Sequence, residues 1–256
     1  MRRSGAADSV LSRAVRILAA FGPDEPALRV TEIAARAGLH VATASRLVAE
    51  LVELGLLSRD EDRSVRIGVR LWELAMRASP TLSLREAAMP FLEVVHGVVG
   101  HHAQIGVLDG TEVLFVERLS APGAVINYTR IAGRLPVHAS SSGLVLLAHA
   151  PRELQEAVLA GPLPRYTAHT ITTPERLRRT LADVRRDGYA YCAGHLHEDA
   201  LGIAVPVRDR EQRVIATLSA IVPNDESARA VIPVLRAAAR GVHRVLAGPG
   251  NRTLAE

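Results

Sequence analysis

Residues 39–60 read LHVATASRLVAELVELGLLSRD, and this stretch decides how the first part of the chain folds. Its apolar residues recur at the spacing of one helix face: Ala44, Leu47, Val48 and Leu51. The spacing predicts a helix over 40–54 that ends at Gly55. On a helical wheel, the opposite face carries small residues and one long cationic side chain, Arg46. A face this smooth can approach another surface closely.

The segments on either side of this helix complete a compact pattern. We expect a first helix from Val10 to Phe21 with Ser9 as N-cap, and a second one in VTEIAARAGL, with Thr31 as a candidate cap and Gly38 after its end. The segment LLSRDEDRSVRIG, residues 56–68, reads as a small hairpin. Three helices, a three-residue joint and a hairpin predict a winged helix-turn-helix within about the first 68 residues.

The smooth face of the third helix suits the major groove of DNA. Thr43 and Ser45 can reach bases or phosphates, and Arg46 can bind a guanine edge with two hydrogen bonds. The hairpin adds three arginines for the neighbouring backbone or minor groove: Arg59, Arg63 and Arg66. The alternative from the residues alone is a solvent-exposed, alanine-rich helix in a plain bundle.

Composition sets broad limits on the chain. At 256 residues it holds one or two domains, and its 31 basic residues are all arginine, with a formal net charge of +4. Residues 1–70 contain 11 Arg against 9 acidic residues, so bulk charge does not decide for nucleic acid. A single cysteine, Cys192, excludes an intrachain disulfide, and we find no signal peptide or membrane span, so we expect a cytoplasmic protein.

The remainder of the chain predicts a second domain of α+β class with mostly antiparallel strands. A candidate linker helix covers 69–79 and is expected to stop at Pro80, and a longer helix from Leu84 to Val99 is expected to bend or break near Pro90. Further elements follow from spacing and turn residues: a hairpin turning at Asp109-Gly110, helices within 138–150 and 151–161, a helix over 174–187 capped by Thr173 and Gly188, strands over 202–209 and 213–222, and a closing helix within 225–246.

Several motifs together resemble the IclR family of bacterial transcriptional regulators. In the first domain these are SRAVRILAAF, VTEIAARAGLHVATASRLVAELVELGLLSRD and VRIGVRLWELA. In the second domain GRLPVHASSSGLVLLA, RRDGYA and IAVPVRDREQRVIATLSAIVP are similar to the effector-binding part of that family. The resemblance covers nearly the whole chain and is specific in order and spacing.

This resemblance implies an architecture and a function. It implies a winged helix-turn-helix domain (1–68), a linker helix (69–81) and a GAF-like effector-binding and oligomerisation domain (82–256). It also implies a homodimer or homotetramer without cofactor or enzymatic activity that binds a palindromic double-stranded DNA operator. We expect a repressor of a catabolic operon, with an activator as the alternative. The expected DNA contacts, beside the hairpin arginines, are Thr31, Val41, Ala42, Thr43, Ser45 and Arg46.

The resemblance also implies where a small-molecule effector binds. Carried over motif by motif, the family's ligand contacts fall on Ser142, Gly143, Leu144, Cys192, Gly202, Ser219 and Ile221. The chain departs from the family pattern at three of these: Cys192 replaces a frequent Asp, Gly202 a frequent Cys and Ile221 a frequent Ser. We therefore expect a roomier, less polar site that takes an aromatic acid or amide rather than a very small acid.

A carboxylate in such a site needs a charged or donating partner. Arg130, His195 and His197 are the candidates.

Two alternatives use the same residues differently. Cys192, His195 and His197 could ligate zinc, with His138 or Glu198 as a fourth ligand, although the spacing is weak. A hydrolase is the second alternative, because three serines, Ser140, Ser141 and Ser142, lie near His138 in the sequence. The strained G-x-S-x-G turn that carries a serine nucleophile is absent, however. We favour serines that cap a helix whose amino-terminal amides hold an anion, and we predict no metal and no catalytic residue.

Overall fold

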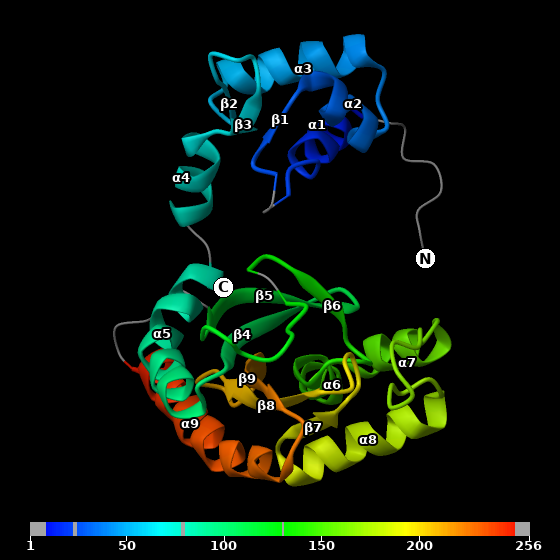
Figure 1. Ribbon diagram of the computed structural model, residues 1–256, viewed down its shortest axis with the longest axis vertical. Helices are drawn as coiled ribbons and strands as arrows, with labels where there is room; N and C mark the ends of the chain where they lie inside the picture. Colours follow the sequence, from blue (N-terminus) through cyan, green and yellow to red (C-terminus); the bar gives the residue numbers. More distant parts are fainter. Residues whose placement is uncertain (1–8, 23–24, 78–79, 130, 249–256) are drawn as a thin grey trace. The chain divides into compact units, whose positions relative to one another are not determined.

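The structure, a computed structural model, describes residues 9–22, 25–77, 80–129 and 131–248. The chain divides into two compact units, Met1–Ser79 and Pro80–Glu256, and each is described by itself (Figure 1). Within the described residues, no helix combines the length and the apolar character needed to cross a lipid bilayer.

The first unit is a winged helix-turn-helix. Its elements are α1 (Val10–Leu18), β1 (Ala27–Leu28), α2 (Val30–Ala37), α3 (Val41–Glu53), β2 (Leu57–Arg59), β3 (Val65–Ile67) and α4 (Val69–Arg77). The three strands form an antiparallel sheet in the order β1-β3-β2. The core contains Ile17, Ile33, Leu47 and Val48 from the three helices, and Leu57 and Val65 from the sheet. The predicted hairpin is confirmed, whereas β1 was not predicted.

The joint between α2 and α3 follows the sequence closely. Gly38 adopts a left-handed conformation (φ 62°), and the amide of Leu39 donates to the Ala34 carbonyl at 2.9 Å, which closes the end of α2. The predicted cap at Thr31 is wrong: α2 begins at Val30, and the Glu32 carboxylate accepts from the Arg29 backbone amide at 2.7 Å. The inward stripe of α3 is confirmed, because Ala44, Leu47, Val48 and Leu51 are all buried.

Two glycines allow the backbone before α4 to pack closely against the backbone after α3. Gly55 has a left-handed conformation (φ 72°), and a Cβ placed on Gly68 would lie only 2.2 Å from the Gly55 carbonyl oxygen. The amide of Gly68 also donates to the Leu56 carbonyl at 2.9 Å. Beyond this anchor, α4 has no fully buried residue.

The second unit has α+β architecture. Its helices are α5 (Pro80–Val99), α6 (Ser141–His149), α7 (Arg152–Ala160), α8 (Pro174–Asp187), the short 3₁₀ helix η1 (Glu226–Ala230) and α9 (Val231–Ala247). Its strands are β4 (His102–Asp109), β5 (Glu112–Ser120), β6 (Arg134–Pro136), β7 (Ala190–Ala193), β8 (Ala200–Arg208) and β9 (Val214–Pro223). They form one antiparallel sheet in the order β6-β5-β4-β9-β8-β7.

Helices cover both faces of this sheet (Figure 1). On one face α5 and α9 bury residues such as Leu92 and Leu235 against Ile105 and Leu218. On the other face α6 and α8 lie over side chains that include Phe115 and Cys192. The two cores are separated by the sheet, and the candidate ligand site lies on the α6 side.

Three local predictions for this unit need correction. α4 ends at Arg77, before Pro80, but the next helix, expected from Leu84, already begins at Pro80, because proline suits a first helical turn in which its missing N–H has no partner to lose. α5 also continues through Pro90 as a single helix. The hairpin turn lies one residue later than expected, because Asp109 pairs with Glu112; only the first turn residue, Gly110, has a positive φ (61°), whereas a type I′ turn requires two.

The caps of α8 are confirmed as predicted. The Thr173 hydroxyl accepts from the Arg176 amide, Pro174 is the first helical residue, and Gly188 ends the helix with a φ of 72°.

Candidate functional sites

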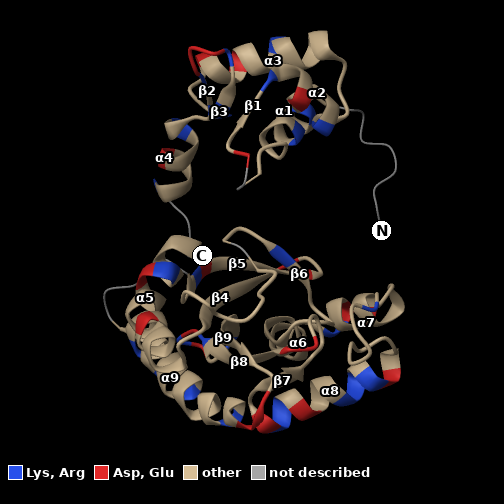
Figure 2. Cartoon of the chain, in the orientation of Figure 1, with Lys and Arg blue, Asp and Glu red and all other residues tan. Residues whose placement is uncertain are grey.

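The outward face of α3 is smooth and almost uncharged, as the sequence predicts. Val41, Ala42, Ser45 and Arg46 are exposed, and Thr43 is half-buried. Figure 2 shows that α3 is mostly uncharged, whereas α8 alternates basic and acidic residues along its length. His40 precedes the helix as its N-cap. The first half of the helix therefore presents small side chains and one guanidinium to its surroundings, and the carboxylates of Glu50 and Glu53 are exposed further along.

The hairpin β2–β3 is less basic than its three arginines suggest. Asp60, Glu61 and Asp62 lie in the same turn, and Asp60 accepts a hydrogen bond from Arg66 Nε. This bond raises the pKa of the Arg66 guanidinium above its ordinary value. Arg59 and Arg63 are exposed, and Arg63 has a positive φ of 67° at the tip. Acidic residues thus offset the charge that the hairpin offers to a phosphate backbone.

Thr31, the remaining predicted contact of the first unit, is exposed on the first turn of α2.

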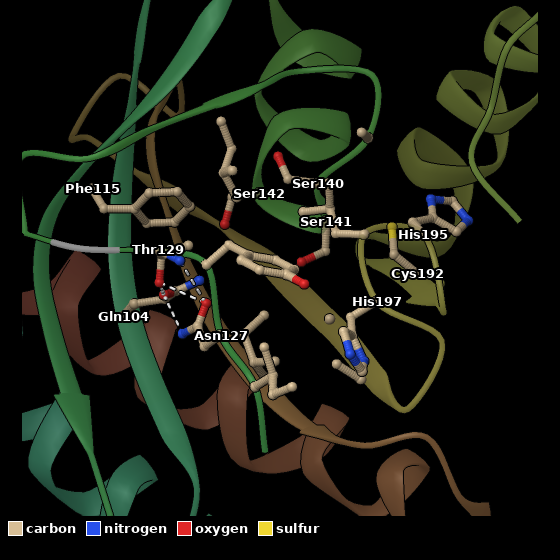
Figure 3. Close-up of a pocket in the computed structure, with 18 residues that line it drawn as sticks. Gln104, Phe115, Asn127, Thr129, Ser140, Ser141, Ser142, Cys192, His195 and His197 are labelled. Carbon is tan, nitrogen blue, oxygen red and sulfur yellow. Dashed lines mark hydrogen bonds between the residues drawn. The ribbon is translucent and has the colours of Figure 1, made fainter. Parts of the chain in front are cut away.

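A cavity opens on the α6 side of the sheet in the second unit (Figure 3). Its lining residues surround about 460 Å³ of space, a volume that includes open solvent at the mouth. The lining is formed by Gln104, Phe115, Ile126, Asn127, Tyr128, Thr129, Leu135, Ala139, Ser140, Ser141, Ser142, Cys192, His195, Leu196, His197, Ala200, Gly202 and Ile221. None of these described lining residues is Arg, Asp or Glu, so the cavity is lined by apolar groups, hydroxyls, amides and two imidazoles.

The register of the sheet explains why distant residues meet in this cavity. Cys192 on β7 pairs with Gly202 on β8, which pairs with Ile221 on β9. Two residues along β9, Ser219 pairs with Gln104 on β4. Side chains in one row across an antiparallel sheet share a face. The row therefore presents Cys192, Gly202 and Ile221 together.

The amino terminus of α6 forms one wall of the cavity. Ser140 caps the helix, and its hydroxyl accepts from the Gly143 amide at 3.1 Å. The amides of Ser141 and Ser142 precede the first intrahelical bond, so they are positioned to donate to an anion. The Ser142 hydroxyl lies 3.0 Å from that of Ser219, which ties α6 to β9.

A polar network forms another wall of the cavity. The Gln104 side-chain oxygen accepts from the Thr129 hydroxyl at 2.6 Å and from Asn127 Nδ2 at 3.3 Å. Asn127 Oδ1 accepts from the Thr129 amide at 2.9 Å. Gln104 and Thr129 are almost completely buried. Sequence reasoning missed these three residues; the only signal was a lone glutamine within the apolar run HAQIGVL.

The cysteine and the two histidines line the cavity in different environments. Burial raises the pKa of the Cys192 thiol to about 12, so it stays protonated near neutral pH. Burial, followed by the nearby charge of Arg176, lowers the pKa of His195 to about 4, and its buried Nδ1 has no hydrogen-bond partner among the residues that the structure describes. His197 Nδ1 accepts from the Asp199 amide at 3.3 Å, and its ring lies 6.1 Å from that of Tyr128.

Neither alternative chemistry gains support from this geometry. Among the residues that the structure describes, no three His, Cys, Asp or Glu side chains are grouped to hold a metal ion. His138 Nε2 donates to the Pro164 carbonyl at 3.0 Å, and the Ser140 hydroxyl donates to the Pro136 carbonyl at 3.2 Å. The imidazole is therefore not arranged as a base for that serine.

The predicted effector residues fall into three groups. Six line the cavity: Ser142, Cys192, His195, His197, Gly202 and Ile221. Gly143, Leu144 and Ser219 are buried and do not line the cavity. Arg130 lies outside the described residues. The side chains of Ser141 and Ile221 fill part of the extra space expected at Gly202. A Cβ at this position would lie 2.9 Å from the Ser141 hydroxyl and 3.3 Å from Ile221 Cδ1.

Comparison with known proteins matches both units. Residues 10–61 match the IclR helix-turn-helix domain, and residues 76–244 match the C-terminal domain of bacterial transcriptional regulator IclR. The chain is 32% identical over 211 residues to the HTH-type transcriptional regulator XynR of Escherichia coli, which spans 82% of this chain and 84% of that protein. It is 32% identical over 215 residues to the p-hydroxybenzoate hydroxylase transcriptional activator of Acinetobacter baylyi, with 82% and 79% covered.

A solved structure is also similar over nearly the whole chain. It is the crystal structure of an IclR homolog complexed with 4-hydroxybenzoate from Microbacterium hydrocarbonoxydans. That protein is 50% identical, the match covers 93% of this chain and 99% of the other, and the TM-score is 0.90.

Proposed function

This chain belongs to the IclR family of bacterial transcriptional regulators, and from that premise we propose that it binds a palindromic operator through α3 and responds to a small aromatic acid. We further propose that it acts in the cytoplasm as a repressor of a catabolic operon. The observation that carries the ligand class is the pair of α6 amino-terminal amides beside an otherwise largely apolar cavity.

The DNA contacts that we propose follow from exposure and size. Val41, Ala42 and Ser45 are small or short enough for the backbone of α3 to enter the major groove, and Thr43 flanks them. Arg46 is the long donor of this face and is suited to a guanine edge. Thr31, Arg59, Arg63 and Arg66 would contact the sugar-phosphate backbone or the minor groove and fix the register.

The effector that we propose is a monocyclic aromatic carboxylate of the hydroxybenzoate type. Phe115, Leu135 and Ile221 supply apolar contacts for a ring. Helix amino-terminal amides stabilise an anion without a basic side chain, which suits a cavity whose described lining holds no arginine. The 4-hydroxybenzoate bound by the 50% identical homolog supports the same ligand class.

Activation is a second candidate for the sign of regulation. It is favoured by the relative from Acinetobacter baylyi, which is named an activator. In either case the effector shifts the balance between DNA-competent and incompetent states by no more than its differential affinity for them. We propose that residues 69–81, which include α4, carry this change.

Footprinting on the DNA upstream of the chain's own gene, with and without 4-hydroxybenzoate, tests this function. We expect protection of a palindrome at modest salt and a change in the half-saturating protein concentration when the acid is added. A reporter gene then separates repression from activation. Lack of any protected palindrome would contradict the proposal.

The variant Arg46→Ala tests the proposed base contact in the same footprinting experiment. It should weaken binding to the cognate site by about 1–3 kcal/mol and relax the preference at one base pair. An equal loss on unrelated DNA would instead make Arg46 a phosphate contact.

A further inference from the structure

We propose that Gln104 is the residue that selects aromatic acids carrying a ring oxygen at the end away from the carboxylate. This inference rests on the proposed function, because it concerns the same cavity. It assigns a specificity role to a side chain on β4, supported by Asn127 and Thr129 from the loop between β5 and β6.

The network uses the oxygen of Gln104 but not its nitrogen. The oxygen receives the Thr129 hydroxyl and the Asn127 amide, at 2.6 and 3.3 Å. Among the described residues, Gln104 Nε2 makes no hydrogen bond, although Gln104 is only 1% exposed and lines the cavity. Nε2 is not one of the buried side-chain atoms without a partner, so it is open to the cavity. The two N–H donors of this amide are therefore available to water or to a ligand in the cavity.

The loop does not depend on Gln104 alone for its position. His102 Nε2 donates to the Val125 carbonyl at 2.6 Å, and Arg118 donates to the Thr129 carbonyl. The Thr129 hydroxyl also has a second acceptor, Asn127 Oδ1, at 2.8 Å. Holding the loop therefore does not account for a glutamine at this position, whereas a donor aimed at a ligand does.

The network and the α6 amino terminus lie on different sides of the cavity. Figure 3 shows Gln104, Asn127 and Thr129 grouped together on one side, with Ser140 and Ser141 on the other, toward Cys192 and His195. Phe115 lies next to the network, on the same side of the cavity in this view. A planar ring against Phe115 would then direct its carboxylate to the α6 amides and an opposite oxygen to Gln104 Nε2.

Calorimetric titration of the full chain with three acids tests the assignment: 4-hydroxybenzoate, benzoate and 4-methylbenzoate. We expect the hydroxy acid to bind at least about tenfold more tightly than the other two, as for a hydrogen bond made to a buried donor. 4-Methylbenzoate matches the size of the hydroxy acid without its oxygen, so this comparison needs no variant.

Gln104→Leu removes the donor and should reduce the preference to less than about threefold, with benzoate affinity retained. Ile221→Val is the matched control, because it trims an apolar wall and should change the affinity for all three acids by a similar factor. Thermal melting of each variant confirms that it is folded.

Three results would overturn the assignment. Equal binding of 4-methylbenzoate and 4-hydroxybenzoate to the parent chain would show that the ring oxygen is not recognised. An equal loss of benzoate and 4-hydroxybenzoate in Gln104→Leu would place the carboxylate, not the ring oxygen, at Gln104. If none of the three acids binds, the aromatic-acid proposal itself fails, whereas binding without discrimination leaves that proposal standing and removes only the role of Gln104.

Discussion

Gly143 shows how closely a single residue position controls the wall of the cavity. A Cβ at this position would lie 2.4 Å from both the Cα and the carbonyl oxygen of Val137, and 2.7 Å from the Ser140 hydroxyl. Backbone atoms cannot move aside cheaply, so the start of α6 would have to shift. Because the amides proposed to hold the carboxylate are those of Ser141 and Ser142, such a shift would also reach the ligand site.

We predict that Gly143→Ala lowers the free energy of unfolding by about 1–3 kcal/mol, as overpacking of a buried site does. Urea denaturation measures this, and calorimetry should show weaker effector binding by the folded variant. Gly97→Ala is the matched control: Gly97 is exposed on α5 with nothing within 4 Å of its Cβ position, so alanine should stabilise the chain by up to about 1 kcal/mol. Unchanged stability of Gly143→Ala would show that α6 can move without cost.

His195 is expected to make stability fall in acid. Burial lowers its pKa to about 4 in the folded chain, from an ordinary value of 6.5. Between these values the unfolded chain binds a proton that the folded chain does not, so unfolding becomes easier as pH falls from about 6.5 toward 4. The stabilisation is fully present above about pH 6.5.

Urea denaturation at pH 7.5 and pH 5 should therefore show a loss for the parent chain on the order of 1–3 kcal/mol, and a smaller loss for His195→Gln. Part of the loss should remain in the variant, because burial also lowers the pKa values of His102, His138 and His149. A variant with the same pH dependence as its parent would exclude His195 as a source of the effect.

At the scale of elements, the hairpin β2–β3 combines basic and acidic residues whose effects on DNA binding oppose each other. Asp60 binds Arg66 directly and also lies 3.2 Å from the Ser64 hydroxyl. If the hairpin contacts the DNA backbone, this carboxylate both repels phosphates and holds a guanidinium away from them.

We predict that Asp60→Asn raises affinity for unrelated DNA and steepens its salt dependence, with the slope of log K against log salt changing by about one unit. Fluorescence anisotropy over a salt series measures both quantities. Glu53→Gln on α3 provides a control for removing a carboxylate of the same unit outside the hairpin. No change in slope for Asp60→Asn would show that the hairpin does not approach the backbone.

The elements that the sequence predicts well are those with regularly spaced apolar residues and recognisable capping residues at their ends. α3 and α8 have both, and their buried stripes and ends lie where the spacing places them. The short strands β1, β6 and β7, of two to four residues, are too short to show an alternation, so only their partners define them. The helix expected from Leu84 begins at Pro80 instead, because proline both ends helices and begins them, and we expected only the first of these roles at this position.

From the sequence we identified the residues of one wall of the cavity but not those of the polar network. The row of Cys192, Gly202 and Ile221 came from resemblance to a family, and the sheet register accounts for it. Gln104 and Thr129 are 25 residues apart, and nothing in the spacing of either segment indicates that the loop after β5 crosses to β4. Such contacts depend on how a loop closes, which local patterns do not encode.

At the scale of the whole molecule, two helices of the first unit leave apolar side chains in solvent. Leu11 and Val15 on α1 are 78% and 63% exposed, and Val69 and Trp72 on α4 are 73% and 62% exposed. Monomeric proteins seldom leave large apolar side chains grouped in this way without a partner. If the operator is palindromic, as we propose, a second copy of the chain is the partner that fits, because each half-site then receives one α3.

We therefore predict that Trp72→Asp weakens a homodimer and, with it, binding to the palindrome. Light scattering coupled to gel filtration measures the mass, and anisotropy measures the affinity for a whole palindrome and for one half-site. Val98→Asp, at an exposed apolar position on α5, tests the second unit in the same way. Loss of the dimer in Val98→Asp alone would place the essential contact in the second unit.

Both half-sites must be engaged together for the dimer to gain affinity, since the second contact becomes intramolecular once the first has formed. A monomeric Trp72→Asp chain should thus bind the palindrome about as weakly as a half-site, while its α3 and Arg46 remain intact. A monomer that held the palindrome as tightly as the parent would show that one copy of α3 reads the operator, and would exclude dimerisation as the source of operator affinity.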